Sequence, residues 1–333
     1  MARVEATISL LKENIAQSLA SIGPVFKYCL LDFPNHPNVG DSAIWVGERI
    51  FLSDLYGFPP VLTCAVNAPL GELQASIATN CVIFLHGGGN FGDIWPHHQR
   101  FRENVVRAFP QNKIVQLPQS IHFNTEAGAE QARDAISSHT DFHLFVRDEE
   151  SLAFAKERLA CRATLCPDLA FCMPKPATMP WTRDLLLLLR TDKEMSQSGE
   201  DALEGLPVED WLYEPPLRLK AAKALYRAAG IARTPFDRNR ALISYYDMLA
   251  KHRVRRGMAQ LASARVIVTD RLHAHILSLL LGRPHAVLDN SYGKIERFDR
   301  AFGIELDGCR RFTRLNEAVA WAKSTNLTHV DGA

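Results

Sequence analysis

The sequence predicts an α/β protein built from two Rossmann-like domains. Short runs of β-branched and other apolar residues alternate with helix-length stretches, which is typical of βαβ units around a parallel sheet. The chain has 333 residues, 47% of them hydrophobic and 23% charged, which is enough apolar material for two cores. In the first half of the chain, the strand-like runs cover residues 26–31, 61–66, 81–85, 113–117 and 142–146.

A proline-rich passage at 173–180 interrupts this alternation and is predicted to link the two domains. Proline is poorly tolerated inside helices and central strands. Beyond this passage, strand-like runs resume at 185–189, 265–269 and 285–288. The predicted domains are therefore residues 1–175 and 181–333. Because ligands bind beyond the carboxyl ends of the strands in such sheets, we expect the domains to face a cleft that holds the site.

The composition excludes several classes of protein. Lys plus Arg (38) and Asp plus Glu (37) nearly cancel, so nucleic acid is not an expected partner. No apolar run approaches the roughly 20 residues that span a bilayer. Seven cysteines without a Cys-x-x-Cys pair favour neither a disulfide framework nor a zinc site. We therefore expect a cytoplasmic protein without a metal or a bound cofactor.

Basic residues are concentrated at positions 218–256, inside the long segment 191–264. One interpretation is the solvated face of a helix. The other is a surface for anionic lipid headgroups or a diphosphate-linked acceptor, with peripheral contact at the inner face of the membrane.

The first polar cluster follows the strand-like run at 26–31. Gly40 permits a tight turn, and Asp41 or Ser42 is expected to cap a helix that begins at Ala43. Asn38 and Asp41 also form an acceptor pair that suits the orientation of a hydroxyl. Helix capping and ligand binding therefore both remain open for this cluster.

The second cluster consists of Gly87, Gly88, Gly89 and Asn90, just after the run at 81–85. Backbone N–H groups of consecutive glycines can approach a ligand closely, and a helix beginning after them would favour anions or oxygen-rich groups. The pattern is neither a Walker loop nor the spaced-glycine dinucleotide fingerprint. The alternative is a merely permissive turn.

Two arginines stand at the ends of strand-like runs, Arg147 after 142–146 and Arg190 after 185–189. The planar guanidinium suits carboxylate or phosphate. The alternative for Arg147 is a salt bridge at the strand end with Asp148 or Glu149.

The fourth cluster, at 265–276, has a β-branched strand that ends at Thr269 and a helix that begins near Leu272. The first free N–H groups of that helix and the charge of Arg271 together predict an anion site. His273 and His275 are two residues apart and so point to different sides of a helix, which makes them a poor metal pair. We expect one to face the ligand and the other to pack.

These motifs resemble those of the polysaccharide pyruvyl transferase family, which carries an Asn-x-Gly-Asp turn, a Gly-Gly-Gly-Asn loop and an Asp-Arg-Leu-His-Ala motif. The resemblance spans about residues 32–302 and is weakest at 191–264. It implies a fold like that of the GT-B glycosyltransferases. It also implies transfer of pyruvate from phosphoenolpyruvate to a sugar of an exopolysaccharide or its lipid-linked precursor, with formation of a ketal and release of phosphate.

The same resemblance assigns the donor to Arg271, the backbone of Leu272, and His273. Arg147 and Arg190 are further candidate donor ligands on this analogy, without a choice between them. We interpret His273 as the general acid that protonates the donor methylene; the alternative is that it only hydrogen-bonds phosphate.

On the acceptor side, Asp41 is expected to orient or deprotonate the sugar hydroxyl, with Asn38 and the residues Gly87 to Asn90 as acceptor ligands. Lys294 follows the run at 285–288 and is either another phosphate ligand or a plain surface lysine. Two rival functions remain open: a nucleotide-sugar-dependent GT-B glycosyltransferase, and a non-catalytic scaffold of polysaccharide assembly.

Overall fold

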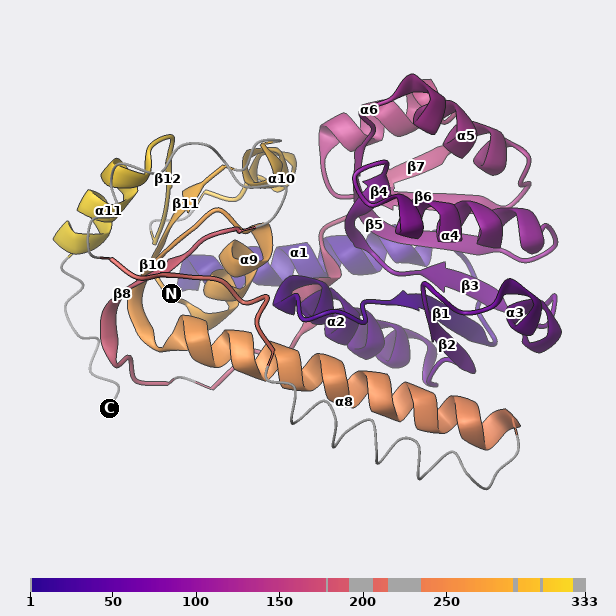
Figure 1. Ribbon diagram of the computed structural model, residues 1–333, viewed down its shortest axis with the longest axis horizontal. Coiled ribbons are helices and arrows are strands. Elements are labelled where there is room, and N and C mark those ends of the chain that lie inside the picture. Colours follow the sequence, from indigo (N-terminus) through magenta and orange to yellow (C-terminus); the bar gives the residue numbers. More distant parts are fainter. Residues whose placement is uncertain are drawn as a thin grey trace. The chain divides into compact units, whose positions relative to one another are not determined.

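The chain folds into two parallel β-sheets with helices around them (Figure 1). This is a computed structural model, which describes residues 2–177, 179–191, 206–214, 235–289, 293–305 and 308–325. All the strand pairings within these ranges are parallel. The predicted α/β class with two Rossmann-like sheets is confirmed.

The chain divides into two compact units, and neither is continuous in sequence. The N-terminal unit comprises Ser9–Met173 and Glu214–Val254; the C-terminal unit comprises Met1–Ile8, Pro174–Tyr213 and Arg255–Ala333. These units differ from the predicted domains because two helices each contribute residues to both. The change of unit near Met173 lies at the start of the proline-rich passage.

The N-terminal unit contains a seven-stranded sheet in the order β2-β1-β3-β5-β6-β7, with β4 paired to β5. Helix α1 contributes from Ser9 onward and α8 up to Val254. The elements are α1 (Ala2–Ala20), β1 (Tyr28–Phe33), α2 (Val39–Tyr56), β2 (Leu62–Ala65), α3 (Leu70–Ser76), β3 (Val82–Leu85), β4 (Gly88–Gly92), α4 (Pro96–Ala108), β5 (Ile114–His122), α5 (Glu126–Ser137), β6 (Phe142–Val146), α6 (Glu149–Arg158), β7 (Arg162–Leu165) and a 3-10 helix, η1 (Leu169–Cys172).

The C-terminal unit contains a five-stranded sheet in the order β12-β11-β10-β8-β9. Helix α11 packs on β10 and β11, and its Leu315, Ala318 and Val319 share a core with Val266 and Leu288. The elements are β8 (Arg183–Leu188), β9 (Val208–Glu209), the part of α8 (Pro235–Ala262) from Arg255 onward, β10 (Ala264–Thr269), α9 (Leu272–Leu281), β11 (His285–Leu288), α10 (Lys294–Phe302), β12 (Cys309–Phe312) and α11 (Leu315–Ser324).

The central strands are apolar because both of their faces are covered. Every residue of the central strands β1 and β3 is buried, as expected for a parallel sheet with helices on both sides, and the edge strand β2 is buried as well. Sequence reasoning missed β7, β9 and β12, which lie at sheet edges and include exposed residues, so their apolar signal is weak.

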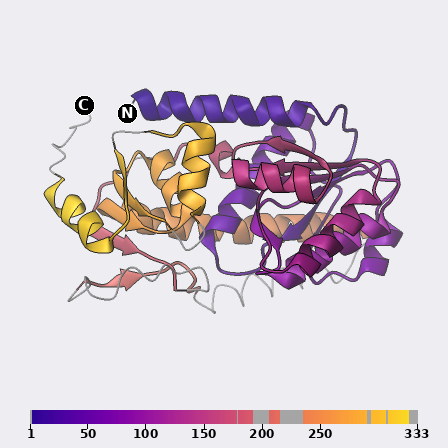
Figure 2. The same ribbon diagram turned by 90° about the horizontal axis from the view of Figure 1, so that it is seen from above.

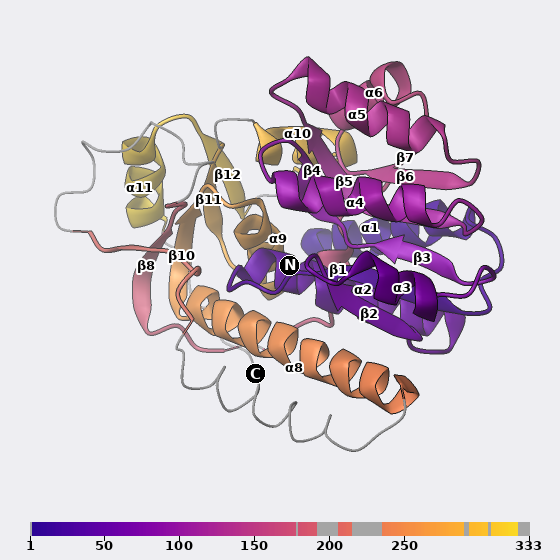
Figure 3. The same cartoon turned by 45° about the vertical axis from the view of Figure 1, so that its right-hand side comes forward.

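Helices α1 and α8 are long, and their apolar residues recur at helical spacing. Figure 2 shows α1 as one continuous helix, and its Leu11, Ile15 and Leu19 are buried. Figures 1 and 3 show α8 running beside α2, where Arg49 of α2 donates to Asp247 of α8. Among the described helices, none is long and apolar enough to cross a membrane.

Candidate functional site

Both sheets have a topological switch point, where the connections after two neighbouring strands run in opposite directions. In the N-terminal unit this point lies between β1 and β3, and in the C-terminal unit it lies between β8 and β10. Ligands of doubly wound sheets bind at the carboxyl ends of the strands at such points. The predicted polar clusters follow these four strands, except for Arg147, which follows β6.

Asn38 is the residue that caps α2, the helix after β1. Its side-chain oxygen accepts from the backbone N–H of Gly40 at 3.0 Å, and α2 begins at Val39. The prediction that Asp41 or Ser42 caps a helix starting at Ala43 is therefore wrong by one turn. Because Asn38 caps a helix one turn longer than predicted, Gly40 is helical rather than part of a turn.

Asp41 lies in the first turn of α2, where the helix dipole favours a carboxylate. Its Oδ2 accepts from Nδ2 of Asn38 at 2.8 Å and lies 3.6 Å from Nε2 of His36. A Cβ built on Gly88, which has φ +128°, would lie 3.7 Å from Asp41 Oδ1. The structure thus brings the first two predicted clusters together.

Gly88, Gly89 and Asn90 of the second cluster lie in strand β4, so the helix expected after the glycines does not start next to them. β3 pairs with residues 114–116 of β5, and β4 pairs with the next part of the same strand, Gln119–His122. The two strands are separated only by His86 and Gly87. Helix α4 begins later, at Pro96. At Gly87 a Cβ would lie 2.8 Å from the carbonyl oxygen of Pro118, which explains the absence of a side chain there.

Asn90 is held by its neighbours within the sheet. Its Oδ1 accepts from Arg102 at 2.8 Å and from Gln119 at 3.0 Å, and its N–H donates to Gln119 Oε1. Because Oδ1 of Asn90 already accepts two hydrogen bonds from protein groups, these bonds fix the position of the residue. Its role as an acceptor ligand stays a prediction.

Sequence reasoning missed the pairing of Glu48 with His86. Glu48 Oε2 lies 2.7 Å from Nδ1 of His86, and its Oε1 accepts from the N–H of Gly87 at 2.7 Å; both side chains are buried. Nε2 of His86 is buried and has no hydrogen-bond partner among the described residues. The sequence could not have predicted this pair, because Glu48 lies in the middle of α2 and belongs to no motif.

The electrostatics of this pair reflect its burial. Burial raises the pKa of Glu48, although the charge of His86 opposes the change. For His86, burial acts to lower the pKa, but the Glu48 carboxylate outweighs it and the pKa is raised. The pair ties α2 to the first residues of the glycine cluster.

Arg147 forms a buried ion pair with Asp168, at 2.5 Å, and its Nε donates to Oγ of Ser120. The proposed partners Asp148 and Glu149 are not the ones found: Asp148 caps α6 by accepting from Ser151 N. The ion pair gives Arg147 a structural partner, and its role as a donor ligand stays a prediction, as does that of Arg190.

In the C-terminal unit, Arg190, Asp210 and Asp270 follow the ends of β8, β9 and β10. The backbone N–H of Arg190 donates to Asp270 Oδ1 at 2.8 Å, and Arg271 donates to Asp210 Oδ2 at 2.6 Å. The Arg271 guanidinium also lies over the ring of Trp211, 5.7 Å from its centroid. Asp210 and Trp211 were missed because they lie in the segment with the weakest resemblance.

Burial raises the pKa of Asp270 to about 6, against the opposing effects of the Arg190 N–H and of the Arg271 and Arg190 charges. A carboxyl group whose pKa is shifted this far, at a topological switch point, is typical of a functional site.

Helix α9 begins at Leu272, as predicted, and its first turn carries the two histidines. His273 is partly exposed, whereas His275 is completely buried. Lys294 is the first residue of α10 and is partly exposed.

Positions 218–234 of the basic region lie outside the described residues. Within α8, Arg253 is buried in an ion pair with Glu214, 3.1 Å from Arg253 Nε, and Arg256 donates to the carbonyls of Tyr213 and Trp211. These two arginines therefore serve the fold and do not belong to a lipid-binding surface.

Two doubly wound sheets with polar clusters at their switch points define an α/β enzyme with Rossmann-like sheets. Residues 38–292 match the family described as polysaccharide pyruvyl transferase. The chain is 37% identical over 308 residues to Pyruvyl transferase 1 of Schizosaccharomyces pombe, covering 85% of this chain and 71% of that protein. It is 29% identical to the putative pyruvyl transferase EpsO of Bacillus subtilis, covering 85% of this chain and 88% of that one.

A crystal structure of an uncharacterised protein from Klebsiella pneumoniae has the same fold. It superposes with a TM-score of 0.62 at 17% identity, covering 91% of this chain and 98% of that chain. The chain described here belongs to the polysaccharide pyruvyl transferase family, as the motifs at 38–41, 87–90 and 270–274 predicted.

Proposed function

We propose that this enzyme transfers pyruvate from phosphoenolpyruvate to a sugar of an exopolysaccharide, or of its lipid-linked precursor, forming a ketal and releasing phosphate. The observation that carries the proposal is the convergence of Arg190, Arg271 and the start of α9 at the carboxyl ends of β8, β9 and β10. A helix start and two guanidinium groups suit a ligand that carries both a phosphate and a carboxylate.

The reaction consumes two acceptor hydroxyls. A proton is added to the donor methylene carbon, and the first hydroxyl oxygen attacks C2. The second hydroxyl oxygen then displaces phosphate from C2 and closes the ketal ring. One hydroxyl proton replaces the proton that the methylene received, and the other leaves with phosphate, so atoms and charge balance.

His273 is assigned the role of general acid, because it is partly exposed in the first turn of α9, beside Arg271 and Leu272. Lys294 is assigned a lesser role as a phosphate ligand. On the acceptor side, Asp41 orients or deprotonates the hydroxyl, with Asn38 and the residues Gly87 to Asn90 lining the acceptor.

The His273→Gln variant tests the donor side. We expect kcat to fall by about 10²–10⁴-fold while the affinity for phosphoenolpyruvate is largely kept, because glutamine can still hydrogen-bond phosphate but cannot supply the proton. Phosphate release measures kcat, and calorimetry measures donor binding. His143→Gln, at the amino end of β6, is the control and should keep full activity. Weakened donor binding with turnover nearly intact would remove the general-acid role.

The Asp41→Asn variant tests the acceptor side. We expect turnover to fall with donor affinity unchanged, because the amide still occupies the space but is a poor base. Asp54→Asn changes an exposed residue of the same helix and should leave turnover unaltered. If Asp41→Asn retains full turnover, the assignment of Asp41 is withdrawn.

The reaction itself is tested by incubating the enzyme with phosphoenolpyruvate and a panel of free and lipid-linked oligosaccharides. Mass spectrometry should find a product heavier by one pyruvate ketal. Thermal stabilisation by a nucleotide sugar, but not by phosphoenolpyruvate, would favour a glycosyltransferase instead. If no acceptor leads to phosphate release, a non-catalytic scaffold becomes the better explanation.

A further inference from the structure

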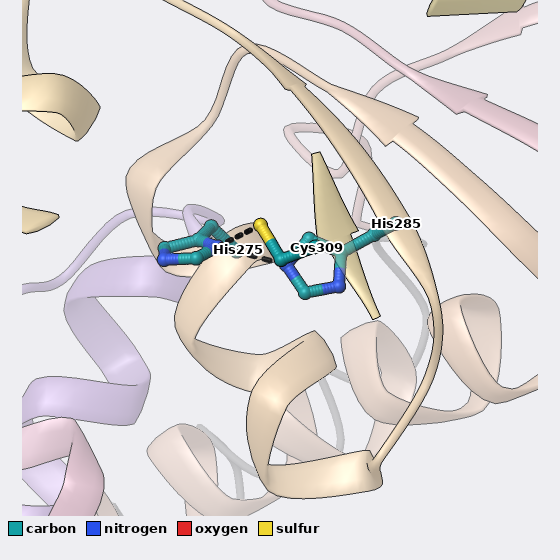
Figure 4. Close-up of side chains that lie close together, drawn as sticks. All are labelled: His275, His285 and Cys309. Atoms are coloured by element: carbon teal, nitrogen blue, oxygen red, sulfur yellow. Dashed lines mark hydrogen bonds between the residues drawn. The ribbon is translucent and has the colours of Figure 1, made fainter. Parts of the chain in front are cut away.

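Three potential metal ligands from different elements of the C-terminal unit converge in its interior. His275 lies on α9, His285 begins β11 and Cys309 begins β12; Figure 4 shows their side chains pointing toward one another. One nitrogen of each histidine and the sulfur of Cys309 all lie within 4.8 Å of one another. The sequence analysis expected no metal, because the cysteines form no Cys-x-x-Cys pair and His273 and His275 point to different sides of a helix.

The distances suit a tetrahedral zinc ion. Zinc binds nitrogen at about 2.0–2.1 Å and thiolate sulfur at about 2.3 Å, so a bound nitrogen and sulfur lie roughly 3.6 Å apart. Cys309 Sγ is 3.7 Å from Nδ1 of His275. Nδ1 of His275 is 2.8 Å from Nε2 of His285, and these two nitrogens would separate by about 0.5 Å around the ion.

The outer hydrogen bonds fix which nitrogen of each ring carries a proton. Nε2 of His275 faces the Asp299 carboxylate at 2.9 Å, and Nδ1 of His285 faces the carbonyl oxygen of Arg283 at 2.8 Å. Both partners are acceptors, so both of these nitrogens donate. When both rings are neutral, each has only one N–H, and the two nitrogens that face each other both carry lone pairs.

Two lone pairs at this distance repel each other unless a cation lies between them. A proton on Nδ1 of His275 would also satisfy the two rings, and Cys309 Sγ would then accept a hydrogen bond from the same nitrogen. A metal ion satisfies all three atoms at once. The outer partners also match the arrangement that orients zinc-bound histidines, namely a carboxylate and a backbone carbonyl on the far nitrogens.

We propose that His275, His285 and Cys309 bind one zinc ion. Two imidazoles and a thiolate are ligands that zinc prefers, and Asp299, which also pairs with Arg311, acts as the outer partner of His275. Cys309 and Asp299 line a cavity of about 380 Å³ together with residues that include Arg311 and Glu305. Three protein ligands would leave the fourth position of a tetrahedral ion to water or a small anion.

The effect of the ion would be to fasten α9 to β11 and β12. Helix α9 carries His273 in its first turn, so zinc would fix the start of that helix. The proposal does not depend on the transfer reaction, because it is tested by metal content and spectroscopy rather than by turnover.

The first experiment measures the metal content of the full-length protein, purified without chelator, by mass spectrometry. We expect about one zinc ion per chain in the wild type and a loss of at least tenfold in Cys309→Ser and His285→Ala. Cys161→Ser replaces another cysteine of the chain, which is not part of this cluster, and should retain the zinc. Asp299→Asn should keep the ligands but weaken zinc binding by about 10–100-fold.

The second experiment needs no variant that might unfold. Cobalt(II) added to the metal-free wild type should give the thiolate-to-cobalt charge-transfer band, and zinc should raise the thermal midpoint of the metal-free protein. A wild type that carries no zinc and gives no cobalt band overturns the proposal, and the shared proton then explains the histidine pair. A cobalt band that persists in Cys309→Ser also overturns it.

Discussion

Asp270 illustrates how a single residue at a switch point acquires unusual properties. It is 4% exposed, and its Oδ1 accepts from the backbone N–H of Arg190 at the end of the neighbouring strand. Burial raises its pKa to about 6. This carboxyl therefore takes up its proton at a higher pH than an ordinary aspartate does.

This shift predicts a pH-dependent effect of Asp270→Asn on stability. The carboxyl has a pKa of roughly 3.9 in the unfolded chain. Its protonation favours the folded state below that value, and this contribution is lost as the pH rises to the folded pKa of about 6. Relative to the wild type, the variant should therefore gain stability across this window, by up to roughly 3 kcal/mol above it.

Urea unfolding of both proteins at about pH 4.5 and about pH 7.5 measures this difference. Asp184→Asn, at an exposed position of β8, is the control. A difference between the Asp270→Asn variant and the wild type that stays the same at both pH values would contradict the prediction.

At the level of elements, strand β4 owes its conformation to its pairing with β5. Gly92 ends β4 with φ +135°, and a Cβ there would lie 1.7 Å from the carbonyl oxygen of His122 in β5. No rotation of a side chain relieves such a clash, because the backbone fixes the position of Cβ and the other partner is a backbone oxygen. The glycine is required for β4 to lie against β5.

We expect Gly92→Ala to destabilise the N-terminal unit by well over about 1 kcal/mol, because strain from the positive φ is added to the clash. Gly57→Ala, at the C-cap of α2, also has a positive φ but nothing within 4 Å of the added carbon, so its loss should be about 1 kcal/mol. Chemical unfolding gives the free energy of unfolding of both variants. The difference between their losses measures the cost of the clash, because both share the strain of a positive φ. An equal loss of stability in the two variants would show that β5 moves away from the added carbon without a loss of free energy.

At the level of the whole molecule, the two units are interleaved in sequence. Residues Glu214–Val254 belong to the N-terminal unit although they lie between two stretches of the other. The buried pair of Arg253 and Glu214 secures this arrangement, because Arg253 also donates to the carbonyl of Pro34 in the loop after β1.

Arg253→Met should therefore destabilise the N-terminal unit, by about 3–5 kcal/mol, because it leaves the Glu214 carboxylate buried without its partner. Hydrogen exchange should show lost protection in α8 and in the loop that contains Pro34. Arg255→Met alters an exposed arginine of the same helix and is expected to have little effect. Unchanged protection in Arg253→Met would mean that the pair contributes nothing to the unit.

The sequence by itself determined the fold class, the strands of the sheet interiors and the family. Runs such as 82–85 and 264–269 are mostly apolar because both faces of a central parallel strand are covered. The residues of each run therefore indicate a buried strand by themselves. The motifs after these strands were visible for the same local reason, since a ligand-binding turn needs particular residues in immediate succession.

Only the tertiary structure decided which distant residues meet. Glu48 with His86, Arg147 with Asp168, Arg271 with Asp210, and His275 with His285 and Cys309 are each brought together by strand order and helix packing. These contacts leave no periodic signal, because a buried polar group needs a partner nearby in space and not at any fixed distance along the chain.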